Sequence, residues 1–153
     1  MREKFTAPGK EVRWYLVEFD EATVPWKKFR GSVIGATDPT QAEAGSLRRL
    51  ILEQWKELGL EAEPSTADNG VHASAGPLEG IKERLTWLRG TLVDDRYAKE
   101  LVKMGVSVEK MQALLDNRDV QLTADGEVGP AFDLTEDMDS SQVAQLVSKM
   151  PFK

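Results

Sequence analysis

The chain has 153 residues, of which 41% are hydrophobic and 30% are charged, which is typical of a globular protein with one modest core or two small units. Its net charge of −6, without a broad basic stripe, argues against general nucleic-acid binding. The lack of cysteine excludes disulfides, thiolate catalysis and cysteine-ligated metals, and the single histidine excludes multi-histidine zinc sites.

The sequence holds no segment that predicts membrane insertion or secretion. No apolar run is long enough to span a bilayer, and no apolar core follows the charged start Met1-Arg2-Glu3-Lys4. We therefore expect a soluble intracellular protein, in the cytoplasm or an organelle matrix, with no membrane span and no nucleic-acid partner. The sequence does not distinguish between these compartments.

The first thirty residues predict a strand followed by a short helix. Val12–Phe19 is rich in aromatic and β-branched residues, which favours a strand. Val24–Arg30 carries proline in its first turn, which suits the start of a helix. The aromatic residues Trp26 and Phe29 are expected to pack in a core rather than to stack on a ligand.

A long helix is expected next, after the turn Gly35-Ala36-Thr37-Asp38-Pro39, in which Thr37-Asp38-Pro39 is a helix-start signal. Arg48 and Arg49 are adjacent, so only one of them can lie at the buried edge of this helix. Such an arginine either grips phosphate in a bidentate manner or belongs to a solvated face. Gly59 is expected to end the helix, whose apolar stripe is Leu47, Leu50, Ile51, Trp55 and Leu58.

The only histidine, His72, lies just before another predicted helix that begins at Pro77. The N-terminus of a helix carries partial positive charge and suits an anion such as phosphate. Glu83 lies early enough in this helix to orient the imidazole, and a histidine held by a carboxylate beside an anion site can act as a phosphate-accepting nucleophile. The alternative is a purely structural histidine. The helix presents an apolar face of Leu78, Ile81, Leu85 and Leu88.

The last sixty residues predict three helices and a hairpin. Asp94–Gly105 favours one helix, and Ser107 is expected to cap a second one. Ala124-Asp125-Gly126 is a hairpin signal, and Asp139-Ser140-Ser141 is expected to cap a last helix. The acidic run between residues 133 and 139 lacks calcium-loop spacing, so it favours a solvated surface over a cation site.

Three motifs together resemble the nucleoside diphosphate kinase family. The family has a Gly-x-Thr-(Asn/Asp)-Pro turn, then Gly-Thr-Ile-Arg, then Asn-x-x-His-(Gly/Ala)-Ser and a helix with a glutamate. The chain has Gly35-Ala36-Thr37-Asp38-Pro39, then Gly45-Ser46-Leu47-Arg48, then Asn69-Gly70-Val71-His72-Ala73-Ser74, with Glu83 at the place of the glutamate. The resemblance covers about residues 12 to 89.

The resemblance implies roles for these residues. His72 would be phosphorylated, and Glu83 and Ser74 would orient its ring. Mg²⁺ bound to a nucleoside di- or triphosphate would be the cofactor and substrate, and no residue of the chain is assigned as a direct metal ligand. The residues implied to contact the nucleotide are Arg48, Thr37, Asn69 and Arg30.

The family pattern is incomplete in this chain. The family's earlier arginine stands four residues before the glycine of the turn, where this chain has Gly31, so Arg30 is one place off. Ala75 replaces a frequent acidic residue, and the connection between Arg48 and Asn69 is longer than usual. The half of the family fold that supplies a lysine, a tyrosine and a base-clamping aromatic is absent.

The resemblance implies an α+β fold, a partial ferredoxin-like antiparallel sheet with helices, in residues 1–90. Its strands would be residues 12–19 and 70–74. Residues 91–153 would be a helical and hairpin extension that contributes few large side chains. Two strands rarely hold a sheet alone, so we expect another protein chain to complete the sheet, or a multisubunit assembly to cover it.

Two functions remain in competition. In one, the chain is the histidine-bearing half of the kinase and acts with a partner chain, or it is a degenerate module, a pseudoenzyme, in a larger assembly. In the other, it is an active nucleoside diphosphate kinase that transfers a γ-phosphoryl group, for example from ATP, through phospho-His72. The missing half predicts little or no phosphotransfer by the isolated chain.

Overall fold

A computed structural model describes residues 6–151 of the chain, which form α-helices, a π-helix and a small antiparallel sheet. The two-stranded sheet is a hairpin near the C-terminus, so the fold is mixed α and β with helices predominating. The elements in chain order are α2 (Trp26–Lys28), the π-helix η1 (Phe29–Ile34), α3 (Leu47–Gln54), α4 (Pro77–Trp87), α5 (Arg96–Lys103), α6 (Val108–Leu115), β1 (Asp119–Gln121), β2 (Val128–Pro130), α7 (Ala131–Leu134) and α8 (Ser140–Lys149).

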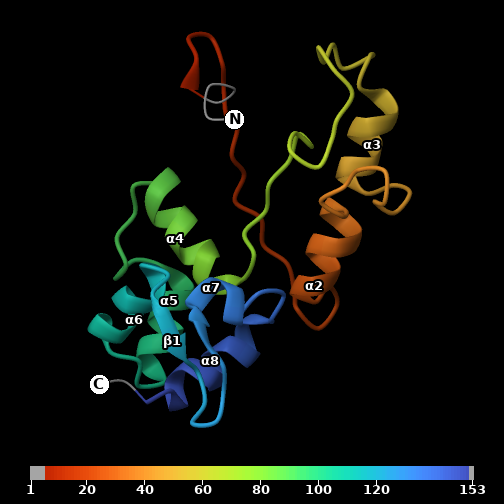
Figure 1. The fold of residues 1–153 in the computed structure, drawn as a ribbon. Helices are drawn as coiled ribbons and strands as arrows, with labels where there is room; N and C mark the ends of the chain where they lie inside the picture. Colours follow the sequence, from red (N-terminus) through yellow and green to blue (C-terminus); the bar gives the residue numbers. More distant parts are fainter. Residues whose placement is uncertain (1–5, 152–153) are drawn as a thin grey trace.

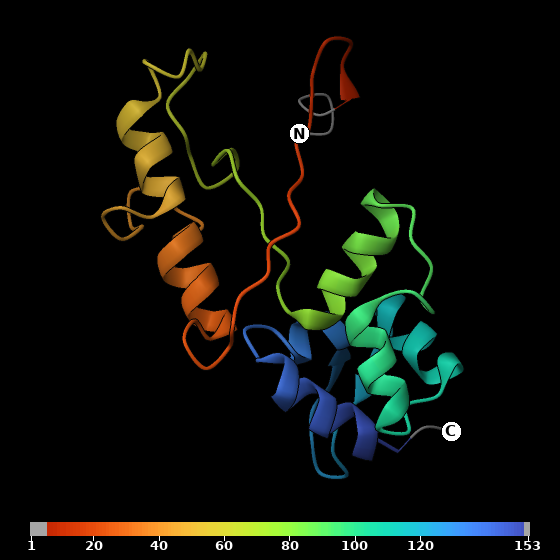
Figure 2. The same ribbon diagram turned by 180° about the vertical axis from the view of Figure 1, so that it is seen from behind.

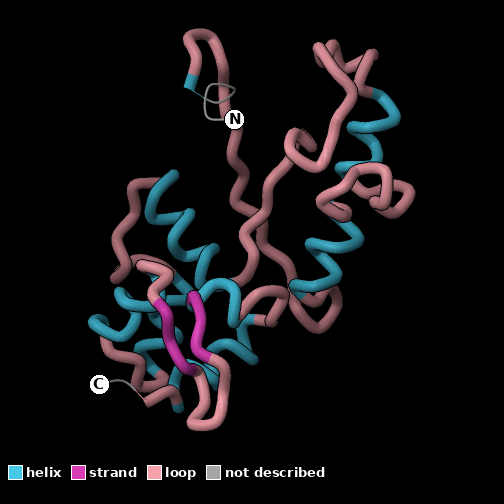
Figure 3. Tube along the Cα trace, viewed as in Figure 1, coloured by secondary structure: helices cyan, strands magenta, loops and turns pink. Residues whose placement is uncertain are grey.

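The described elements fall into two regions. Helices α4 to α8 and the hairpin pack together, whereas α3 stands apart at the end of the segment that begins with α2 (Figures 1 and 2). A long stretch with almost no regular structure, between α3 and α4, connects the two regions, and another long loop precedes α2 (Figure 3). The packed core therefore lies in the C-terminal half of the chain.

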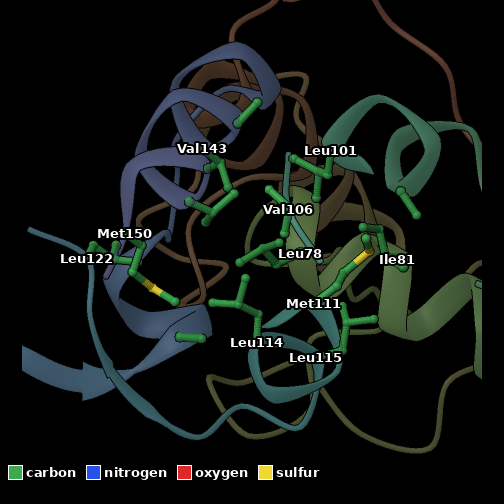
Figure 4. Packing of buried hydrophobic residues seen from close by; sticks show 14 residues of the cluster. Leu78, Ile81, Leu101, Val106, Met111, Leu114, Leu115, Leu122, Val143 and Met150 are labelled. Carbon is green, nitrogen blue, oxygen red and sulfur yellow. The ribbon is translucent and has the colours of Figure 1, made fainter. Parts of the chain in front are cut away.

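This core is a cluster of apolar side chains from helices α4, α5, α6, α7 and α8 and from adjacent loops (Figure 4). Leu78 and Ile81 from α4 pack against residues of α5, α6 and α8. Burial of each such side chain contributes about 1.5–3 kcal/mol before the entropy cost of folding. The cluster crosses the expected domain boundary at residue 90, because α4 belongs to it. Its members with 0% exposure are Leu78, Ile81, Leu101, Met111, Leu114, Ala131, Val143 and Val147.

Local capping explains where the C-terminal helices begin. The Asp95 side chain accepts a hydrogen bond from the backbone of Ala98 at the start of α5, and the Ser107 hydroxyl accepts one from Lys110 in α6. Asp139 and Gln142 form a reciprocal capping box at α8. The predicted helices in this half and the predicted hairpin are therefore confirmed.

The two predicted strands are wrong. Residues 12–19 and 70–74 have no ladder partner among the described residues, and most side chains from Val12 to Val17 are largely exposed. A strand is stable only when its backbone groups pair with a neighbour, and the described chain offers none there. The sheet consists instead of β1 and β2, which pair with Val120 opposite Gly129. The described residues 6–151 therefore form no ferredoxin-like sheet.

The apolar stripe of α3 is not buried as expected. Leu47 is 43% exposed, because the C-terminal core lies away from this helix. The expectation that the helix runs to Gly59 is also wrong, because α3 ends at Gln54 and Leu58, which is 55% exposed, lies in the turns that follow. The helix also begins at Leu47 rather than near Pro39. The Asp38 carboxylate accepts a hydrogen bond from the backbone of Thr40, which closes a turn instead of starting a helix. The expectation that the C-terminal extension contributes few large side chains is also wrong, because it holds most of the core.

The segment from Phe19 to Arg30 attaches to the C-terminal region. Phe19 stacks on Phe29 at 4.7 Å between ring centroids and meets Trp26 edge-on at 5.4 Å. The backbone N–H of Trp26 donates to Asp139 Oδ1 at 2.6 Å. The acidic run before α8 is therefore not merely a solvated surface, because it holds the N-terminal segment in place.

Candidate functional site

The single histidine lies next to a glutamate on α4. Nε2 of His72 is 2.7 Å from Oε1 of Glu83, and the His72 side chain is 69% exposed. The contact exists because α4 places its apolar residues toward the core and Glu83 on the opposite face. The predicted proximity of His72 to Glu83 is confirmed.

Ser74 completes a chain of hydrogen bonds through Glu83. Its hydroxyl donates to Oε2 of Glu83 at 2.5 Å, so both carboxylate oxygens are engaged. The carbonyl of Ser74 accepts a hydrogen bond from the indole N–H of Trp26 at 3.1 Å. Trp26 thereby fixes the backbone two residues after His72, and Ser74 fixes the carboxylate that orients the ring.

The charges and hydrogen bonds in this cluster raise the pKa of His72 and lower the pKa of Glu83. The hydrogen bond to Glu83 raises the pKa of His72 above its ordinary value, against the effect of partial burial, and the carboxylates of Glu83 and Glu79 add to the rise. The same hydrogen bond lowers the pKa of Glu83, and the Ser74 hydroxyl lowers it further. The pair therefore favours an ionised carboxylate beside the imidazole.

Arg48 connects the glycine turn to the segment that carries the histidine. Its guanidinium donates to the carbonyl of Gly35 at 2.8 Å and to that of Val71 at 3.1 Å. Burial lowers the pKa of Arg48, and the charge of Arg30 lowers it further, so the two cations lie in the same neighbourhood. Arg48 also lowers the pKa of His72, which places its charge close to the imidazole.

Asn69 and Thr37 also meet, although through the backbone. The amide of Asn69 donates to the carbonyl of Thr37 at 3.1 Å, which joins the polar loop before His72 to the glycine turn. Gly35, in this turn, has φ 99° and ψ 161°, a conformation that essentially only glycine adopts. The order of the motifs in the sequence therefore corresponds to direct contacts between them.

Of the residues implied to contact the nucleotide, Arg30 has the hydrogen-bond partners that lie farthest away in the sequence. Its Nη1 contacts Glu136 Oε1 at 2.8 Å and Asp137 Oδ1 at 2.6 Å, so it pairs with the loop before α8. Sequence reasoning did not foresee these partners, because they lie more than a hundred residues away in the chain.

Glu79 is a further residue of the cluster that the sequence analysis missed. It lies in the first turn of α4, and its carboxylate accepts a hydrogen bond from the backbone N–H of Ala75. Its spacing of four residues from Glu83 is the signal that could have identified it, because residues i and i+4 share a helix face.

The chain matches no family model, no curated protein and no solved structure. Among the described helices, none is long and apolar enough to cross a bilayer.

Proposed function

We propose that this chain is the histidine-bearing half of a nucleoside-diphosphate-kinase-like phosphotransferase, with His72 as the phosphoryl acceptor. The observation that carries the proposal is the 2.7 Å contact between His72 Nε2 and Glu83, on an imidazole that is largely exposed. An exposed ring with one nitrogen held by a carboxylate has the arrangement that nucleophilic catalysis requires.

Nδ1 is the proposed nucleophile, and the engagement of Nε2 by Glu83 supports this choice. Nδ1 attacks the γ-phosphorus of a nucleoside triphosphate, the bond from that phosphorus to the bridging oxygen breaks, and the nucleoside diphosphate leaves with the electron pair. A β-phosphate oxygen of a second nucleoside diphosphate then takes the phosphoryl group and restores the imidazole. Glu83 stabilises the positive charge that develops on the ring.

The nucleotide phosphates would be held by the cations around the glycine turn. Arg48 and Arg30 are the candidates, with Thr37 and Asn69 at the same turn. Both guanidinium groups already have partners, in the carbonyls of Gly35 and Val71 and in the acidic pair before α8. Nucleotide binding therefore requires that one of them exchange these partners for phosphate oxygens. Mg²⁺ would enter with the nucleotide, ligated mainly by phosphate and water oxygens.

A partner chain is part of the proposal. The family's lysine, tyrosine and aromatic clamp have no counterpart here, so a second chain would supply them and could pair with residues 12–19 or 70–74 to build the ferredoxin-like sheet. The exposed arm before Phe19 supports this, because Trp14 is 50% exposed and Tyr15 is 80% exposed.

The second candidate function is that of a non-catalytic subunit. The same exposed arm favours it, since apolar side chains in an unpaired extended segment are suited to β-augmentation by a partner. In that case the contacts of His72 would only stabilise the start of α4.

The test separates the chemistry of His72 from nucleotide binding. The purified chain is incubated with phosphoramidate, a small phosphoryl donor that needs no nucleotide site, and in parallel with Mg²⁺ and γ-labelled ATP. Phosphorylation is measured by intact-protein mass and by its acid-labile, alkali-stable character. We expect one phosphoryl group from phosphoramidate and slow or no labelling by ATP in the absence of a partner.

Two variants identify the site. His72→Gln should abolish the modification, and Glu83→Gln should slow it by about tenfold or more, since an orienting carboxylate contributes at that level or above. Arg13→Gln is the matched control, because Arg13 is exposed and pairs with Glu11, which is also exposed. The catalytic proposal is rejected, and the structural one favoured, if the wild-type chain takes no phosphoryl group from either donor. The same holds if the His72→Gln variant is phosphorylated as well as the wild type.

A further inference from the structure

His72, Glu79 and Glu83 gather three potential metal-ligating atoms in one place. One ring nitrogen and one oxygen from each carboxylate all lie within 4.8 Å of one another. The three residues come from the start of α4 and from the segment just before it. The sequence analysis assigned no direct metal ligand, and Glu79 has no part in the phosphoryl chemistry proposed above.

The local fold holds the trio together. Glu79 and Glu83 are one helical turn apart on the face of α4 opposite to Leu78 and Ile81, which are fully buried. The backbone N–H of Ala75 holds the first carboxylate and the hydroxyl of Ser74 holds the second. Such outer contacts orient the ligands of metal sites in proteins.

We propose that His72, Glu79 and Glu83 form a binding site for a divalent transition-metal ion, with Zn²⁺ as the ion that fits best. One imidazole and two carboxylates are a mixed nitrogen and oxygen set, which suits zinc, whereas Mg²⁺ and Ca²⁺ prefer oxygen ligands alone. Three protein ligands leave a fourth position for water, as in sites that are not purely structural.

The distances and charges are compatible with such a site. Tetrahedral zinc bonds of about 2.0–2.2 Å place the ligand atoms roughly 3.4 Å apart. The wider separations, of up to 4.8 Å, must therefore shorten, and the 2.7 Å contact between His72 and Glu83 must open to admit the ion. Rotation of the two glutamate side chains can provide both changes. His72 is largely exposed, so an ion can enter from solvent. Two carboxylates balance the charge of a divalent ion, and the nearby cation of Arg48 acts against binding without cancelling them.

A bound metal ion would compete with phosphorylation for the imidazole. The metal proposal rests on the geometry of the three side chains and not on the proposed function, so the two can fail separately. Metal binding is measured without nucleotide, and phosphorylation by phosphoramidate, which needs no Mg²⁺-nucleotide, is measured with chelator present.

The experiment uses the full chain, purified without a histidine tag and stripped of metal. Zn²⁺ binding is measured by calorimetry, and Co²⁺ serves as a spectroscopic probe whose visible bands report ligand number and type. We expect one ion per chain, and affinity lower by at least about tenfold in Glu79→Gln, since even the loss of an outer contact costs that much in metal sites. Glu109→Gln is the matched control, because Glu109 is also in the first turn of a helix, α6, and is far from His72 in sequence.

A measurement on the wild-type chain avoids any effect of substitution on folding. His72 is the only histidine, so its ring signals in an NMR spectrum are unambiguous. Addition of Zn²⁺ should shift or broaden them, and the same change in Glu79→Gln should require at least about tenfold more Zn²⁺. The proposal is overturned if the ring signals do not respond to Zn²⁺. It is also overturned if Glu79→Gln binds the ion as tightly as the wild type and the control Glu109→Gln do.

Discussion

Arg30 Nη1 lies 2.6 Å from Asp137 Oδ1, so the π-helix η1 is joined to the loop before α8 across 107 residues of sequence. The same nitrogen contacts Glu136 Oε1 at 2.8 Å. Burial by itself would lower the pKa of Arg30, but the two carboxylates outweigh it and raise the pKa above its ordinary value. The arginine therefore links the N-terminal segment to the packed C-terminal region.

This link should be measurable but small. Arg30→Gln and Asp137→Asn should each lower the free energy of unfolding by about 1 kcal/mol or less, and the coupling between them should weaken in high salt, because the pair is partly exposed. A double-mutant cycle by chemical denaturation measures the coupling. Arg13→Gln is the control and should have no effect. Equal effects at Arg13 and Arg30 would show that the contact contributes nothing specific.

Substitutions in the two halves of the chain should differ strongly in cost. Ile81→Ala removes a fully buried side chain from the core and should cost about 2–5 kcal/mol. Leu50→Ala, in a helix whose apolar side is partly solvated, should cost about 1 kcal/mol or less, since Leu50 is 36% exposed. Denaturation midpoints of the two variants check this. Equal costs would mean that a partner or a second copy buries α3 in solution.

Amide hydrogen exchange should show the same division within the wild-type chain. The backbone amides of α4, α6 and α8 lie against the core and should be protected to the level of global unfolding. Those of α3 should exchange faster, because no residue of this helix is buried. Exchange followed residue by residue by NMR measures this order. Protection of α3 equal to that of α6 would contradict it.

Asp95 should make the free energy of unfolding depend on pH in the acid range. Burial alone would raise the pKa of Asp95, but the hydrogen bonds from Arg84 and from the backbone of Ala98 outweigh burial, so the folded-state pKa lies below the unfolded value. The stability it contributes is therefore fully present above about pH 4, the unfolded value, and is lost as pH falls through the lowered pKa.

Asp95→Asn tests this assignment, because asparagine keeps the helix cap but removes the charge. The variant should be less stable than the wild type at neutral pH, and the difference should shrink in acid as the wild-type carboxyl becomes protonated. Thermal melts across the acid range measure the difference. A constant difference at every pH would exclude the Arg84 ion pair as its source.

Gly35 should be far more sensitive to alanine than Gly45. A Cβ at Gly35 would lie 2.6 Å from Ser46 Oγ and 3.0 Å from Ala42 Cβ, whereas a Cβ at Gly45 would meet nothing within 4 Å. Both residues have positive φ, so both substitutions carry a backbone cost, of about 1–3 kcal/mol at Gly35. Only Gly35→Ala adds the clash. Chemical denaturation compares the free energies of unfolding of the two variants. Equal destabilisation would mean that Ser46 and Ala42 move away from the new Cβ without a measurable loss of stability.

The local signals in the C-terminal half were sufficient for prediction. Ser107 and Asp139 are caps that act over three residues, and the hairpin of β1 and β2 is set by the turn between its strands. The contact of His72 with Glu83 was also predictable, since it spans a single helix start. Such features depend on neighbours in sequence, so a single chain contains the information.

The strands at residues 12–19 and 70–74 could not be predicted correctly from one sequence. Their composition favours a strand, but a strand needs a partner, and the described chain offers none. The contacts of Arg30 were beyond prediction for the opposite reason, because both partners lie at the far end of the chain. The apolar face predicted for α4 is buried at Leu78 and Ile81. The apolar stripe predicted for α3 is not buried, because no core packs against it.

The π-helix η1 carries one more residue per turn than an α-helix would. The N–H of Gly35 donates to the carbonyl of Arg30 at 3.0 Å, a closure over five residues instead of four. An arginine that stands one place early relative to the family pattern therefore sits in the segment that accommodates one extra residue. Removal of Ser32 should convert this wide turn to an ordinary α-helical one and leave the residues on either side close to their present positions. The single-residue offset would then be an insertion absorbed within the helix itself, which leaves the geometry of the following glycine turn unchanged.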